Sequence, residues 1–164
     1  PVRALLESEH RPDGFFVNVH DRPGPYMVGD ETVKIAGQSH VREDVGGVSY
    51  LVSPTAFFQT NVSAATELQR LVVSSQAGAA RILDLYCGSG LFTLPLARQG
   101  ATVVGIEENS QAVRDAEANA RLNRVPSSRV RFVAGRAEDL LRSFSRESWD
   151  GVVLDPPRQG CAPG

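Results

Sequence analysis

The sequence predicts an α/β fold in which helices cover both faces of a parallel β-sheet, with a small β-rich region ahead of it. From residue 53 onward, short apolar segments alternate with helical segments, the pattern of parallel strands joined by crossover helices. A glycine-rich turn follows the first apolar strand, and before residue 53 short strand-like segments are separated by turn residues. We therefore divide the chain into a β-rich subdomain, residues 1–52, and an α/β unit, residues 53–164.

The β-rich region is expected to contain strands at residues 15–19, 32–36, 41–44 and 48–52. The segment 21–25, DRPGP, has the composition of a turn. Gly46 and Gly47 stand between the last two of these strands, which indicates a tight hairpin.

The α/β unit is expected to begin with a helix from Ser53 to about Ser75, because Ser53 can cap a helix and Pro54 suits its first turn. Asn109 or Ser110 can cap a later helix that has alanines on one face. The remaining predicted elements are strands at 81–85, 102–106, 130–133 and 151–154, and helices at 92–98 and 137–144.

Composition restricts the classes of function. The net charge is −2, whereas proteins that bind many phosphates usually carry a basic excess. No apolar run is long enough to span a membrane. The two cysteines do not suggest a disulfide framework, and the three separated histidines make a metal site unlikely in this sequence, so we expect no metal and a reducing, cytoplasmic location. Since Met does not open the sequence, we expect it to be part of a longer one.

The strongest motif is DLYCGSG, residues 84–90, at the end of the first apolar strand. Glycines at this position let a ligand approach the backbone, and Glu107, 17 positions after Gly90, suits hydrogen bonds to ribose hydroxyls. Thr93 stands where a dinucleotide motif needs a third glycine, and Asp84 can hold an ammonium group. These residues favour S-adenosylmethionine over NAD, although a tight turn without a ligand has the same glycines.

Two further motifs follow structural elements. The DPPR segment, residues 155–158, comes directly after the fourth apolar strand, where prolines would hold Asp155 and Arg158 at the carboxyl edge of the sheet. A rigid turn with an exposed ion pair explains it equally well. The segment SPTAFFQTN, residues 53–61, is by its pattern alone structural, with Phe58 expected in the core.

In their order along the chain, SPTAFFQTN, LDLYCGSG, GIEEN and LDPPRQG resemble the motifs of the RNA 5-methyluridine methyltransferases, which methylate carbon 5 of uracil in tRNA or rRNA. The resemblance runs from about Val45 to the C-terminus. It implies a Rossmann-like class I methyltransferase core with strands in the order 3-2-1-4, S-adenosyl-L-methionine as cofactor, and RNA as partner. It also implies that residues 1–52 are the tail of an RNA-contacting region. The intact protein would be a monomer without membrane contact.

Carried over by position, the resemblance implies roles for individual residues. Phe57 would lie beside a flipped target base, Asp155 at the boundary between cofactor and uracil, and Arg158 toward the RNA. Together with Asp84, the expected cofactor contacts are Gln59, Tyr86, Gly88, Gly90, Leu91, Glu107, Arg136, Ala137 and Asp155.

The family's catalytic cysteine, which attacks carbon 6 of uracil, and the glutamate that removes the carbon 5 proton lie beyond the DPPR motif. We interpret Cys87 as a small buried residue, and Cys161 follows DPPR too closely to match the nucleophile. We therefore expect this chain alone to be inactive. A non-catalytic S-adenosylmethionine- or RNA-binding module, an NAD-dependent oxidoreductase and an amino-group methyltransferase remain alternatives. The last has an aromatic residue where this chain has Arg158.

The order 3-2-1-4 also predicts that residues 151–154 form the edge of the sheet. An apolar edge strand promotes association unless something covers it. We therefore expect the chain alone to be marginally stable or to associate through this strand, and we expect following residues to cover it in the intact protein.

Overall fold

The computed structural model describes residues 2–20, 29, 31–158, 160 and 161. The turn predicted at residues 21–25 lies outside these residues. In chain order the elements are α1 (Val2–Leu6), β1 (Gly14–Val19), β2 (Glu31–Gly37), β3 (Val41–Val45), β4 (Val48–Val52), α2 (Val62–Ser75), β5 (Arg81–Leu85), α3 (Thr93–Arg98), β6 (Thr102–Glu107), α4 (Ser110–Leu122), β7 (Val130–Ala134), α5 (Ala137–Phe144) and β8 (Gly151–Leu154).

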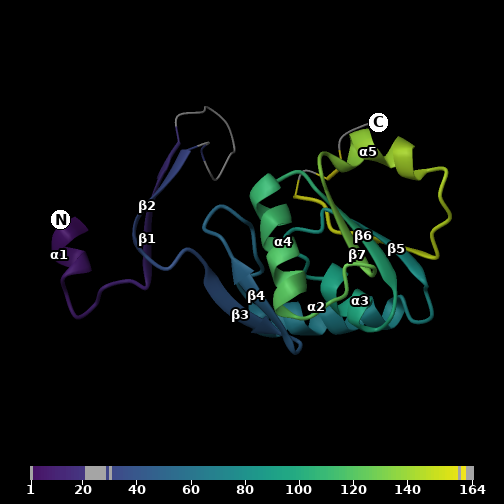
Figure 1. Ribbon diagram of the computed structural model, residues 1–164, viewed down its shortest axis with the longest axis horizontal. Coiled ribbons are helices and arrows are strands. Elements are labelled where there is room, and N and C mark those ends of the chain that lie inside the picture. The colour runs from purple at the N-terminus through teal and green to yellow at the C-terminus, as the bar shows by residue number, and fades with distance from the viewer. Residues whose placement is uncertain (1, 21–28, 30, 159, 162–164) are drawn as a thin grey trace.

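A four-stranded parallel sheet forms the centre of the α/β unit, with its strands in the order β7-β6-β5-β8 (Figure 1). This confirms the predicted parallel sheet and its order 3-2-1-4. Asp84 on β5 pairs with Gly105 on β6 and with Val153 on β8, so the carboxyl ends of all three strands lie at one edge of the sheet. The glycine loop, residues 86–90, leaves the sheet at that edge.

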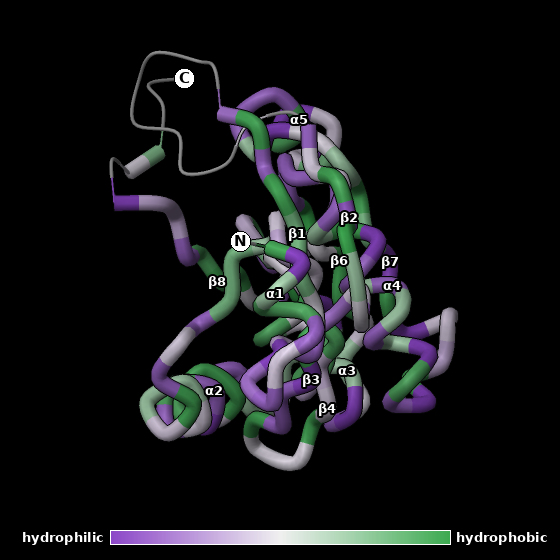
Figure 2. Tube along the Cα trace, turned by 90° about the vertical axis from the view of Figure 1, so that its left-hand side faces the viewer, coloured by the Kyte–Doolittle hydropathy of each residue, from purple (hydrophilic) through white to green (hydrophobic). Residues whose placement is uncertain are grey.

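Helices cover both faces of this sheet. Successive residues of a strand point to opposite faces, and they therefore enter two different cores. Ile82 and Val103 belong to the larger core, which α2, α3 and α4 help to build. Leu83 and Val104 face the other way and pack with α5. Figure 2 shows hydrophobic residues along β6 and β8, as expected for strands within such a layer.

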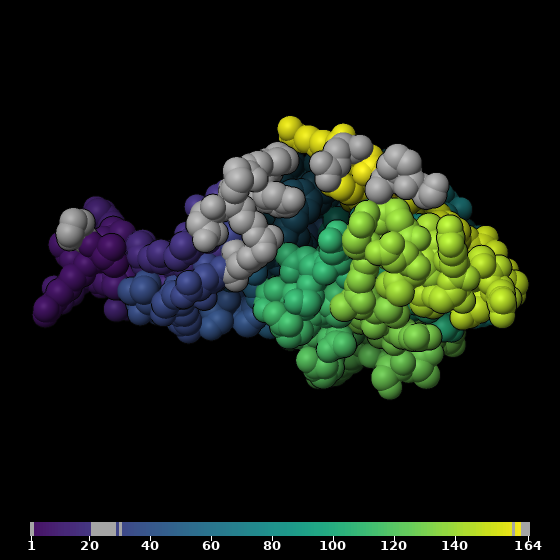
Figure 3. Space-filling model, turned by 90° about the horizontal axis from the view of Figure 1, so that it is seen from above, coloured from purple at the N-terminus to yellow at the C-terminus, as the bar shows by residue number. Residues whose placement is uncertain are grey.

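The two hairpins of the N-terminal region differ in their relation to the sheet. The β3–β4 hairpin turns at Gly46 and Gly47, whose φ values of 56° and 78° match the turn that suits a two-residue hairpin. Its Val45 and Tyr50 are fully buried and belong to the larger core. The β1–β2 hairpin and α1 lie to the side of the α/β unit (Figures 1 and 3). The boundary that we place after residue 52 therefore separates segments that share one core.

The helix predicted from Ser53 begins instead at Val62, so that prediction is wrong at its N-terminus. The Ser53 hydroxyl does not cap a helix, because it donates to Asp115 Oδ1 at 2.8 Å. Asn61 is the actual cap, and its side chain accepts a hydrogen bond from the Ala64 amide. Residues 53–61 consequently form an irregular segment between β4 and α2.

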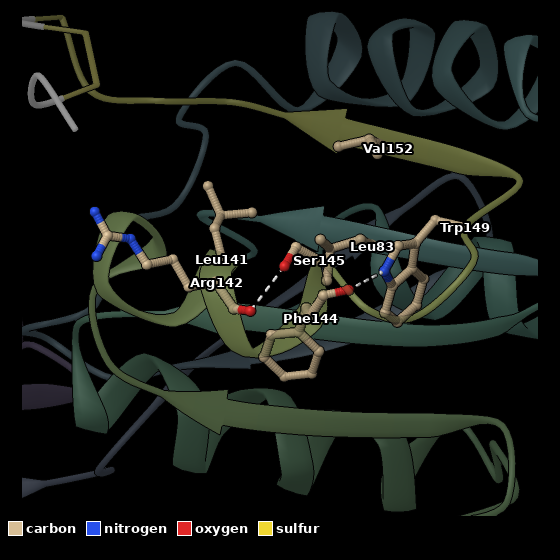
Figure 4. A pocket seen from close by; sticks show the side chains of 7 residues that line it. All are labelled: Leu83, Leu141, Arg142, Phe144, Ser145, Trp149 and Val152. Carbon is tan, nitrogen blue, oxygen red and sulfur yellow. Dashed lines mark hydrogen bonds between the residues drawn. The ribbon is translucent and has the colours of Figure 1, made fainter.

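An apolar cavity of about 350 Å³ lies between α5 and β8. Figure 4 shows its lining side chains, among which Trp149 Nε1 donates to the Phe144 carbonyl at 3.1 Å. The lining residues are Leu83, Leu141, Arg142, Phe144, Ser145, Trp149 and Val152. None of them belongs to the sequence-predicted site, so this cavity is a separate feature. Among the described residues, no helix is long and apolar enough to cross a bilayer.

Candidate cofactor site at the carboxyl edge of the sheet

The glycine loop turns sharply as it leaves β5. Tyr86, Gly88 and Gly90 all have positive φ values, of 62°, 54° and 92°. This backbone conformation is unfavourable for a tyrosine, and the Tyr86 hydroxyl is fixed by donating to Glu138 Oε1 at 2.8 Å. A Cβ atom added at Gly88 would meet no atom within 4 Å. The loop therefore has an open side at Gly88 where a ligand can approach its backbone.

Glu107 lies at the end of β6 with its carboxylate fixed from two sides. Its Oε2 accepts a hydrogen bond from the Gly88 amide at 3.0 Å, and its Oε1 accepts one from the Asn109 amide at 2.7 Å. Each carboxylate oxygen has a second lone pair. Glu107 is thus an oriented acceptor, only partly buried, with capacity left for hydroxyl groups such as those of a ribose.

Asp84 is a fully buried carboxylate with only part of its hydrogen-bonding capacity used. Thr93 Oγ1 donates to its Oδ2 at 2.5 Å, whereas Oδ1 has no partner among the described residues. Burial raises the pKa of Asp84 to about 7; the Thr93 bond opposes this rise, and the charges of Asp155 and Glu107 add to it. A cationic group at Oδ1 would satisfy this oxygen and favour the ionised carboxylate.

The DPPR segment follows β8 at the same edge of the sheet. The Asp155 amide donates to the Leu85 carbonyl at 3.4 Å, which places Asp155 beside the end of β5. Desolvation raises the pKa of Asp155, although the residue as a whole is exposed. Arg158 is exposed in the turn that follows. The position of Asp155 relative to Asp84 agrees with the prediction that both lie at this edge.

Asn109 connects the irregular segment 53–61 to the same edge. Its side-chain Nδ2 donates to the Thr55 carbonyl at 3.0 Å, while its Oδ1 caps α4. Phe58 packs on Tyr50 with ring centroids 5.3 Å apart and contributes to the core, as predicted. Phe57 is 70% exposed and Gln59 is half-buried.

The residues predicted around the start of α5 lie near Tyr86. Arg136 occupies the cap position of α5, and its Nε lies 3.9 Å from Glu138 Oε2. Ala137 is buried in the smaller core. The Gly135 amide donates to the Glu107 carbonyl at 2.9 Å, so this turn adjoins the end of β6. Leu91, at the other end of the glycine loop, is also buried.

The described residues therefore bring Asp84, Gly88, Glu107 and Asp155 to one edge, and they leave Phe57 and Arg158 exposed. Sequence reasoning missed the contacts that hold this cluster. Glu138 showed only as an acidic residue in the first turn of a helix, and Asn109 only as a cap. Glu138 binds Tyr86 and Asn109 binds Thr55, and in both pairs the two residues lie more than 50 positions apart in the sequence.

The surroundings of Cys87 are not those of an activated nucleophile. Cys87 is 3% exposed, and burial raises the pKa of its thiol well above the ordinary value, which confirms its interpretation as a small buried residue. Cys161 is exposed, after the DPPR segment. Within the described part of the chain, no group of three potential metal ligands lies close together.

Comparisons with known proteins identify the kind of domain to which this fold belongs. A protein-family model for a methyltransferase domain matches residues 77–161. An uncharacterized RNA methyltransferase of Synechocystis sp. is 40% identical over 161 residues, which is 94% of this chain and 34% of the relative. The 23S rRNA (uracil(747)-C(5))-methyltransferase of Pyrococcus abyssi is 40% identical over 126 residues, 77% of this chain and 29% of that protein.

The crystal structure of Pyrococcus abyssi tRNA (uracil-54, C5)-methyltransferase, solved in complex with S-adenosyl-L-homocysteine, superposes with a TM-score of 0.74 and 33% identity. The match covers 92% of this chain and 36% of that chain. The chain thus spans about a third of the length of its relatives. The fold is that of the S-adenosylmethionine-dependent class I methyltransferases. The chain therefore belongs to the methyltransferase-domain family, and it is similar to RNA methyltransferases, among them uracil-C5 enzymes.

Proposed function

We propose that this chain carries the cofactor site, and part of the base-binding surface, for methylation of carbon 5 of uridine in tRNA or rRNA. The observation that supports this most is the junction at Asn109. Its backbone amide fixes the Glu107 carboxylate, and its side chain fixes Thr55 in the segment that presents Phe57. One residue thus ties the ribose-facing acceptor to an exposed aromatic side chain.

In this proposal the carboxyl edge of the sheet binds S-adenosylmethionine, which supplies an electrophilic methyl group. Asp84 Oδ1 accepts from the ammonium group, and Glu107 accepts from the ribose hydroxyls. The open side of Gly88 lets the cofactor lie against the backbone. The other proposed cofactor contacts are Gln59, Tyr86, Gly90, Leu91, Arg136, Ala137 and Asp155.

The RNA side of the site would use the exposed residues at the same edge. Phe57 offers an aromatic face on which a base taken out of its stack can lie. Asp155 lies beside the end of β5, and the exposed Arg158 can contact a phosphate. Relatives that act on rRNA and on tRNA both match the chain, so the proposal includes both substrates. The two free thiols are compatible with a reducing cytoplasm.

Calorimetry with S-adenosylhomocysteine tests the cofactor site. Glu107→Ala removes an oriented acceptor, and we expect binding to weaken by about 1–3 kcal/mol, the usual effect of losing hydrogen bonds to a charged group. Glu108→Ala is the matched control, since Glu108 is the next residue and is exposed. Equal affinities of the two variants would exclude Glu107 from the site.

A non-catalytic S-adenosylmethionine- or RNA-binding module is the second candidate for this chain. The burial of Cys87 supports it, because a buried thiol with a raised pKa is not a nucleophile. Both candidates predict cofactor binding without methylation of RNA by the 164-residue chain alone, so turnover by this chain would exclude the non-catalytic module.

A further inference from the structure

A row of polar side chains on α4 binds the outer edge of the β3–β4 hairpin. The pairs are Asp115 with Ser53, Asn119 with Leu51, and Asn123 with Ser49. We call these three pairs the α4–β4 ladder. Four helix residues advance about 6 Å, close to the roughly 6.7 Å advance of two strand residues. Successive turns of α4 therefore stay in register with alternate residues of β4 and of its extension at Ser53.

Two of these pairs use asparagine amides that imitate the partner strand of a sheet. Asn119 Oδ1 accepts from the Leu51 amide at 2.7 Å, and its Nδ2 donates to the Leu51 carbonyl at 3.1 Å. Asn123 binds the amide and carbonyl of Ser49 in the same way, at 3.0 and 2.7 Å. The hydrogen-bonding groups along this edge of β4 are thereby satisfied by a helix.

The two asparagines differ in where the second N–H of each amide goes. In Asn119 it donates to the carbonyl of Ser89, in the glycine loop, at 3.2 Å. In Asn123 it donates to the Asn119 carbonyl at 2.8 Å, within α4 itself. Only the Asn119 pair of the α4–β4 ladder therefore connects β4 to the proposed cofactor loop.

We infer that Asn119 is a positioning residue for the proposed methyl transfer, one that sets the glycine loop relative to β4 and to the segment after it. This inference rests on the proposed function. Asn119 is fully buried, and β4 leads directly into residues 53–61, which carry Phe57. The Asn119 amide thus connects the glycine loop, at Ser89, with β4, at Leu51. The glycine loop belongs to the proposed cofactor site, and β4 leads to the segment that carries Phe57.

A second contact, from the same hairpin and from α2, holds the backbone at Leu91, directly after the glycine loop. The Tyr50 hydroxyl and Gln69 Nε2 both donate to the Leu91 carbonyl, at 3.2 and 3.0 Å. The carbonyls of Ser89 and Leu91 are thus both bound by side chains that contact or belong to β4. These bonds leave the open side of Gly88 free for a ligand.

The experiment compares Asn119→Asp with Asn123→Asp in the 164-residue chain. Both changes keep the acceptor and replace the donating amide, but only the first breaks the bond to Ser89. Under conditions where both variants are fully folded, we expect Asn119→Asp to weaken S-adenosylhomocysteine binding about three- to tenfold and Asn123→Asp to change it less than about twofold. Hydrogen exchange without ligand should accelerate at the amides of residues 88–92 in Asn119→Asp alone, beyond any change in global stability.

If Asn119→Asp does not fold, the pair Asn119→Ala and Asn123→Ala replaces it, with the same expected contrast. Equal changes in both variants of a pair, in binding and in exchange, would overturn the inference and leave the cofactor site intact. Failure of the unmodified chain to bind S-adenosylhomocysteine would overturn the proposed cofactor site, and this inference with it.

Discussion

At the scale of single residues, Asp84 combines complete burial with an incomplete set of partners. Thr93 satisfies one carboxylate oxygen, and the other has no partner among the described residues. Leaving a buried carboxylate in this state destabilises the ionised form, which is why its pKa rises to about 7. The proposed ammonium contact would reverse that penalty. Asp84 therefore links protonation, stability and cofactor binding.

The first prediction concerns stability against pH in the absence of cofactor. The pKa of Asp84 rises from 3.8 to about 7 on folding, so the folded state binds this proton more tightly. Its contribution to the free energy of unfolding is complete below about pH 4 and is lost as the pH rises through about 7, with an upper bound of about 4 kcal/mol. Urea unfolding across this range should show the loss, and Asp84→Asn should flatten it. An identical slope in both proteins would contradict the assignment.

Cofactor binding should show the opposite dependence, because the ammonium group binds the ionised carboxylate. We expect the affinity for S-adenosylhomocysteine to rise as the pH increases through about 7, and Asp84→Asn to bind more weakly without that rise. Calorimetry in buffers of different ionisation enthalpy would count the proton released. Equal affinity at about pH 6 and about pH 8 would exclude Asp84 from the ammonium site.

At the scale of elements, β8 is an edge strand within the described part of the chain. Val152 and Leu154 on it are 51% and 53% exposed, and Val152 also lines the apolar cavity beside α5. We predict that the 164-residue chain associates through this edge or is marginally stable. Light scattering should detect the association, and Val152→Lys should reduce it, because a charge on an edge strand opposes pairing.

Val41→Lys is the control, because Val41 is 62% exposed on β3, away from this edge. Association that both lysine variants reduce equally would not involve β8 specifically. A monodisperse monomer whose amides at residues 152–154 are strongly protected from exchange would show that the prediction is wrong.

The strands and helices of the α/β unit were largely predictable because their signals are local. Apolar runs bounded by turn residues gave β5 and β8 their observed bounds, and α5 also has its predicted bounds. The start of α2 could not be predicted, since Ser53 has the same local signal as a cap. Its actual partner, Asp115, lies far away on α4 and could be found only from the tertiary structure.

The candidate site was predictable to the same extent. The meeting of Asp84, Gly88 and Glu107 follows from parallel strands ending at one edge. The bonds that fix those residues, from Glu138 and Asn109, depend on how helices pack. Asn119 did leave a signal in the sequence, a polar residue on the alanine-rich face of a helix, but that signal does not identify its partners.

At the scale of the whole molecule, the chain covers about a third of the length of its relatives. We predict that the 164-residue chain binds cofactor without methylating RNA, because Cys87 is buried and Cys161 does not match the expected nucleophile. Incubation with labelled S-adenosylmethionine and undermodified tRNA or rRNA tests this. Turnover above background that Cys161→Ser abolishes would contradict it and identify Cys161 as the nucleophile.

The α4–β4 ladder also restricts how the length of this protein can vary. One residue inserted in α4 between Asp115 and Asn119 would rotate the rest of the helix by about 100° and carry Asn119 and Asn123 away from β4 together. Residues 54–61 lie outside this ladder and should accommodate a change in length more easily. Among homologous sequences, gaps should therefore be rare between positions 115 and 123, even where the residues on the outer face of α4 diverge.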